Sequence, residues 1–185
     1  MHAYRNKKAE AVSLHPNNWF YNYCIRILIE RVSDWVERRS ILDFKSPQKL
    51  KLVFSKRGGH SYRHVETYTE LLSIQAQKGT LYQSIRAPKF SVIDHKLIEV
   101  VQHSRLAGLQ MADIVASAFY NAANTSNLKH WDTAPAMALM PRVASTGNHI
   151  KIYKNIGLTL LPWHPQHAGL SSEQKAIFEH YGYKL

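Results

Sequence analysis

The sequence predicts a mixed α/β fold, because helix-like and strand-like hydrophobic patterns alternate along the chain. Apolar residues recur at three- and four-residue intervals from about 18 to 39, which predicts a helix. Apolar residues alternate with polar or small ones from 49 to 55, which predicts a strand. A second helical pattern runs from about 62 to 77. We expect these elements to pack around one hydrophobic core.

The first predicted helix has an apolar arc that covers more than half of its circumference. Cys24 lies in this arc, so we expect it to be buried like a small hydrophobic residue. Arg31 also falls in the arc, so its guanidinium should find a carboxylate or a set of carbonyls. The opposite, polar side of the helix is made of Asn22, Arg26, Glu30, Ser33, Asp34 and Glu37.

The rest of the chain continues the alternation. Short strands are predicted at 80–85, 90–93 and 97–102, followed by a helix that carries Asp113 and ends near 123. A short helical stretch is predicted at 136–140, and an edge strand at 155–161. The last helix should begin at Ser171, because Ser171 and Gln174 have the spacing of a capping box, and it should end near Gly182.

Length and composition indicate a single domain over residues 1–185. A hydrophobic fraction of 45% argues against wholesale disorder. No apolar run reaches the ~18 residues of a membrane span, and the N-terminus lacks the apolar core of a secretory signal. The single cysteine suits a reducing compartment. We therefore expect a cytoplasmic protein with no membrane partner.

The charge balance points to a polyanionic partner. Lysines and arginines outnumber aspartates and glutamates by 24 to 13, which gives a net charge of +11. Such an excess favours nucleic acid, the commonest polyanion in a cytoplasm. The basic residues are dispersed in short groups, however, and dispersion is also typical of an ordinary solvated surface. Charge alone leaves both interpretations open.

One carboxylate, that of Asp113, lies on a helix side whose other members are apolar and mostly small. Leu109, Ala112, Ala116 and Tyr120 share that side at ~100° per residue. Removing an unpaired carboxylate from water costs several kcal/mol, so a buried Asp113 should have a partner: a metal ion, a basic side chain or backbone donors. The alternative is a half-exposed aspartate in a first helical turn, with no role.

Several segments together resemble a bacterial and phage family known as domain of unknown function 3800. The most specific match is the stretch Leu109-Gln110-Met111-Ala112-Asp113, within a longer match over 103–118. Further matches lie at 20–33, at 53–59 and at 157–162, so the resemblance covers about 12–183. It divides the chain into a family core at about 12–125 and a C-terminal extension at 126–185.

The resemblance implies a ribonuclease-H-like mixed sheet flanked by helices, and a metal-dependent nuclease. Carried over by motif, Asp113 is the catalytic carboxylate that binds Mg²⁺ or Mn²⁺. Two such ions can stabilise the attacking and leaving oxygens of a phosphodiester. Glu30 is our candidate for a second catalytic acid. Lys56 and Arg57, in a turn before Gly58-Gly59, and Arg105 are the candidate phosphate-binding residues.

The chain departs from the family at its start. Family members begin with a strand that carries an Asp-Glu-Ser motif, whereas the first residues here are basic and include no aspartate. We therefore expect an N-terminally truncated member with weak or absent catalysis, in which Glu30, Asp43 and Asp94 are the available substitute acids. The alternative is a non-catalytic nucleic-acid-binding or assembly module, such as a phage- or defence-associated remnant. A missing sheet edge would also favour a homo-oligomer.

Overall fold

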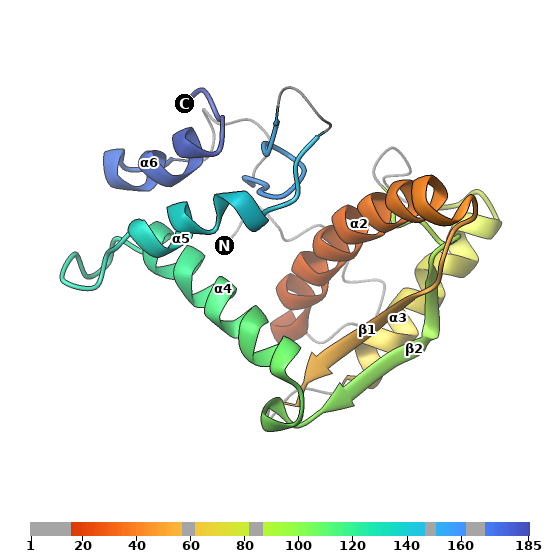
Figure 1. The fold of residues 1–185 in the computed structure, drawn as a ribbon. Helices are drawn as coiled ribbons and strands as arrows, with labels where there is room; N and C mark the ends of the chain where they lie inside the picture. Colours follow the sequence, from red (N-terminus) through yellow and green to blue (C-terminus); the bar gives the residue numbers. More distant parts are fainter. Residues whose placement is uncertain (1–15, 57–61, 82–86, 147–150, 162–168) are drawn as a thin grey trace. The chain divides into compact units, whose positions relative to one another are not determined.

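Helices and a two-stranded parallel sheet make up the part of the chain that the structure, a computed structural model, describes: residues 16–56, 62–81, 87–146, 151–161 and 169–185. The fold is therefore mixed α/β, as the sequence predicts (Figure 1). The chain divides into two compact units, residues 1–101 and 102–185. The boundary precedes the helix that carries Asp113.

In the first unit, a long helix is followed in the chain by a β-α-β arrangement. Its elements are α2 (Pro16–Phe44), β1 (Leu50–Ser55), α3 (Arg63–Gln77) and β2 (Ile93–Val101). The two strands are parallel, so they need a long connection, and α3 lies within it (Figure 1). The buried core of this unit is formed by residues from both helices, from the turn before β2 and from the first residue of β2: Ile25, Ile29, Val65, Val92 and Ile93.

The pairing of the two strands is interrupted once, near their beginnings. Leu50 pairs with Ile93, but Leu52 already pairs with Ile98, so the segment 94–97 of β2 bulges out of the ladder. The pairing is regular from Leu52 to Ser55, which pairs with Val101. Beyond it, the backbone N–H of Lys56 donates to the carbonyl of Val101 at 2.7 Å. The strands thus end together.

Part of the polar side of α2 is buried: Asn22, Glu30 and Ser33 lie below the surface, as does Ser40 further along the helix. Neighbouring loops hydrogen-bond to the two serines. Ser33 Oγ accepts from the backbone N–H of Lys89 at 2.9 Å, and Ser40 Oγ from that of Gln48 at 3.2 Å. On other sides of the helix, Leu28, Trp35 and Leu42 are exposed.

Cys24 is also exposed, not buried as predicted. Even so, its surroundings desolvate the thiol enough to raise the pKa of Cys24 above its ordinary value. The prediction for Arg31 is confirmed, because its guanidinium lies 3.6 Å from the carboxylate of Glu30.

The second unit is helical. It contains the 3₁₀ helix η3 (His103–Arg105), α4 (Ala107–Ala123), α5 (Ala134–Ala138), the 3₁₀ helix η4 (Met140–Arg142) and α6 (Ser172–His180). Its core joins the C-terminal half of α4 to α5, to the segment 151–161 and to α6 with the residue that follows it: Ala118, Ala122, Ala136, Tyr153, Ile177 and Tyr181. The predicted capping box of α6 is confirmed, with the Ser171 hydroxyl and the Gln174 amide each accepting from the other's backbone N–H.

Two predicted strands are wrong. Residues 90–92 form a turn, and β2 begins only at Ile93. In place of an edge strand at 155–161 there is a tight turn, in which the N–H groups of Ile156, Gly157 and Leu158 donate to the carbonyl of Tyr153 at 3.0–3.2 Å. Most of the predicted strand at 80–85 lies outside the described residues. In the described part of the chain, no helix is both long and apolar enough to cross a membrane.

Candidate functional site

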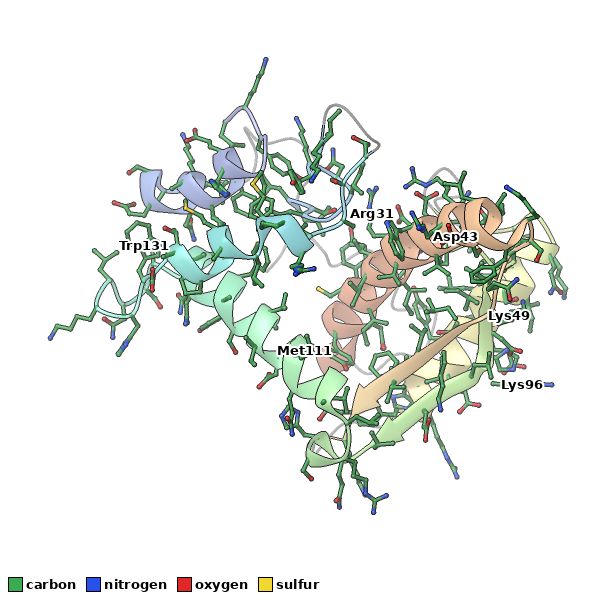
Figure 2. All side chains as sticks on the ribbon, in the orientation of Figure 1. Arg31, Asp43, Lys49, Lys96, Met111 and Trp131 are labelled. Atoms are coloured by element: carbon green, nitrogen blue, oxygen red, sulfur yellow. The ribbon has the colours of Figure 1, made fainter. Side chains whose placement is uncertain are left out.

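Asp113 lies on α4 in the second unit, and its side chain is exposed. Of the two alternatives that the sequence leaves open for Asp113, a buried carboxylate and an exposed one, the structure has the exposed one. The helix packs into the unit through its C-terminal half, at Ala118 and Ala122, whereas its first turns are exposed; Met111, labelled in Figure 2, is exposed to 66%. A carboxylate in water carries no large desolvation cost. The exposure of Asp113 therefore removes the argument that a bound cation must compensate its charge.

Glu30 is buried, but its surroundings explain its charge without a metal ion. It lies on α2 in the first unit with 7% of its surface exposed, and Arg31 is its ion-pair partner. A nearby positive charge lowers the cost of burying a carboxylate. Glu30 belongs to a different unit from Asp113.

The other two substitute acids, Asp43 and Asp94, also accept hydrogen bonds from protein groups. The Asp43 carboxylate accepts from Arg39 Nε at 2.7 Å, one turn earlier on α2. An oxygen of Asp94 accepts from the backbone N–H of Lys96 at 2.9 Å, within the bulge of β2. Among the residues that the structure describes, no three histidine, cysteine, aspartate or glutamate side chains gather into a group that could hold a metal ion.

The predicted phosphate-binding residues are distributed over both units. Lys56 is exposed and directly follows β1, where both parallel strands end. Ligands of open α/β sheets commonly bind beyond this end of the strands. Arg57 lies outside the described residues. Arg105 is exposed in η3, in the second unit.

Sequence reasoning missed a polar hollow at the opposite end of the strand pair. It has a volume of about 280 Å³ and lies between the second half of α3 and the start of β2. Lys49, directly before β1, and Lys96, on β2, are part of its lining (Figure 2). No sequence signal marks this hollow, because it depends on the irregular pairing of β2.

Comparisons of the chain with known protein families, with curated proteins and with solved structures found no match.

Proposed function

We propose that this protein binds nucleic acid through dispersed positive charge, as a non-catalytic module that requires no metal ion for binding. The observation that carries the proposal is the charge balance, which is positive in each unit. Residues 1–101 contain 17 lysines and arginines against 9 aspartates and glutamates, and residues 102–185 contain 7 against 4. Basic residues that neutralise phosphates release counterions, which supplies most of the affinity in sequence-independent binding.

The pairing of the acids in the first unit supports this proposal. Asp34 and Asp43 each hold an arginine one turn away at 2.7 Å, and Glu37 lies 3.9 Å from the ammonium of Lys89. Exposed lysines such as Lys49, Lys56 and Lys96 form no ion pair among the described residues. The excess positive charge is thus presented to solvent.

A metal-dependent phosphodiesterase of ribonuclease-H-like fold is the second candidate. Its support is the sequence resemblance together with one structural observation: the most similar segment, 103–118, folds as η3 and the first turns of α4, so Asp113 lies on a helix that follows a strand. A two-metal mechanism requires several converging carboxylates, which the described residues do not provide.

A cleavage assay distinguishes the two candidates. The intact protein is incubated with single-stranded and duplex oligonucleotides in Mg²⁺ or Mn²⁺, beside an Asp113→Asn variant. The binding module predicts shifted but uncleaved oligonucleotides with both proteins. Cleavage that needs the divalent ion and is lost in Asp113→Asn would contradict the module and support the phosphodiesterase.

A further proposal concerns self-association. Pairing through the edges of the two-stranded sheet would appear as a dimer mass in light scattering, and a monomer mass would refute it.

A further inference from the structure

The bulge of β2 gives three consecutive side chains one common surface. Asp94, His95 and Lys96 all line the hollow beside α3. In a regular strand, successive side chains point to opposite faces, so three neighbours would not share one hollow. The interrupted register between Leu50 and Leu52 makes this arrangement possible. Bulges are typical of places where a strand re-aims side chains toward a functional site.

The other walls of the hollow supply further hydrogen-bonding groups. Thr69, Ser73 and Gln77 lie on one side of α3 at four-residue intervals, and all three line the hollow. The Thr69 hydroxyl is already used, because it donates to the carbonyl of Val65 at 2.7 Å. Ser73 and Gln77 have a hydroxyl and an amide that can donate to a ligand.

The charges around the hollow favour an anion. Lys49 and Lys96 are both exposed and have no carboxylate partner among the described residues; Lys49 Nζ only approaches the carbonyl of Phe90, at 3.5 Å. Asp94 is the one acid among the described residues that line the hollow, and one of its oxygens accepts from the backbone N–H of Lys96. His95 Nε2 lies 3.9 Å from the carboxylate of Glu70.

We propose that this hollow binds a single phosphate group, held by the ammonium groups of Lys49 and Lys96 and by donors from Ser73 and Gln77. Lysine binds phosphate as a point charge, whereas bidentate capture of a carboxylate favours arginine, and the described part of the lining contains lysines but no arginine. At about 280 Å³ the hollow is smaller than the ~300–1,000 Å³ typical of sites for drug-sized ligands, which suits a phosphate with part of its ester.

The test measures binding of inorganic phosphate to the intact protein by calorimetry, in chloride buffer at constant ionic strength. The variant is Lys49→Ala/Lys96→Ala. The control is Lys129→Ala/Lys184→Ala, which removes the same charge from exposed positions of the second unit. Charge-assisted hydrogen bonds are the stronger ones, so we expect Kd to rise at least about tenfold in the first variant and to stay within about twofold in the control.

Two outcomes would overturn the proposal: wild-type protein that binds no phosphate at millimolar concentration, or equal binding by both double variants. Circular dichroism checks that both variants fold. A Gln77→Ala variant tests the α3 side of the hollow without changing the charge. Unchanged phosphate affinity in this variant would show that the Gln77 side chain does not bind the phosphate.

A second arm identifies the source of the phosphate. Affinity for an oligonucleotide with a 5′-phosphate is compared with that for the same strand with a 5′-hydroxyl. If the 5′-phosphate strengthens binding in wild type but not in Lys49→Ala/Lys96→Ala, the ligand is a strand end. If only inorganic phosphate and nucleoside monophosphates respond to the variant, the ligand is a free phosphate ester. The proposal does not depend on nucleic-acid binding by the whole protein, which the salt dependence of binding tests separately.

Discussion

Tyr181 ties α6 to α5 in the second unit. Its side chain is fully buried, its ring contacts Phe119 and Tyr153 at 5.6 Å between centroids, and its hydroxyl donates to the carbonyl of Ala136 at 2.7 Å. Desolvation raises the pKa of Tyr181 above its ordinary value, and the neighbouring Tyr153 adds to this. The residue therefore links packing, hydrogen bonding and pH dependence at one position.

We predict that Tyr181→Phe lowers the free energy of unfolding by about 1–3 kcal/mol, because it leaves the buried Ala136 carbonyl without its donor. Since the folded-state pKa is raised, the contribution of this phenol is present below pH ~10 and is lost as the pH rises through the folded value. Urea unfolding at pH 7 and above pH 10 tests both statements. Tyr120→Phe, at an exposed position, should change stability by less than ~0.5 kcal/mol. Equal losses in the two variants would contradict the role of Tyr181.

Whether the protein binds a divalent metal ion can be tested at the side chain of Asp113. Because this carboxylate is exposed, we predict that Mg²⁺ or Mn²⁺ changes the melting temperature of wild type and Asp113→Asn equally. A bound ion at 100 times its Kd would stabilise the folded state by about 2.7 kcal/mol, which a thermal melt detects readily. The control is Glu179→Gln, which removes an exposed carboxylate from α6. A rise seen in wild type and Glu179→Gln but absent in Asp113→Asn would favour the phosphodiesterase.

At the scale of elements, the tight turn after Tyr153 depends on a glycine. A Cβ added at Gly157 would collide with the Val143 side chain and with the backbone carbonyl of Ala144. The valine can move, but the carbonyl belongs to the backbone. We predict that Gly157→Ala costs about 1–3 kcal/mol in urea unfolding.

Gly108→Ala is the matched control for this glycine. A Cβ at position 108 would meet nothing within 4 Å, and alanine is the better helix former in α4. We expect this variant to be as stable as wild type or more stable. If both alanine variants unfold at the wild-type urea concentration, the close packing of the turn is refuted.

The elements that follow from local pattern were predictable from the sequence. The helix over 18–39 extends to Pro16–Phe44, and the strand at 49–55 and the helix at 62–77 lie within one residue of their observed bounds. The capping box at Ser171 was equally local. Each of these depends on the spacing of a few neighbouring residues, which can be read directly from the sequence.

The features that depend on tertiary contact were not predictable. Ser33, on the polar side of α2, is buried where the distant backbone N–H of Lys89 donates to it. Asp113 is exposed because only the far half of α4 packs into its unit. The hollow beside Lys96 exists because β2 bulges where it pairs with β1. Each of these features depends on contacts between segments that are far apart in the sequence.

For the whole molecule, we propose that positive charge carried by both units binds nucleic acid. On this proposal single residues matter less than their sum, and binding needs no metal ion. Lys56, exposed at the end of β1, is the best-placed single contact, whereas Lys51 on the same strand is engaged in an ion pair with Glu99. Losing one phosphate contact should weaken binding of all sequences alike and reduce the salt slope by about one.

The most direct test is fluorescence polarisation of a labelled oligonucleotide, titrated with protein from 50 to 300 mM KCl, in EDTA and again in Mg²⁺. We predict that the logarithm of the association constant falls linearly with the logarithm of salt concentration, by ~0.7–0.9 per phosphate neutralised. Binding and its salt dependence should persist in EDTA, and in EDTA the slope should be smaller for Lys56→Gln and unchanged for Lys51→Gln. Absence of binding at 50 mM KCl, or affinity that does not respond to salt, would contradict the account.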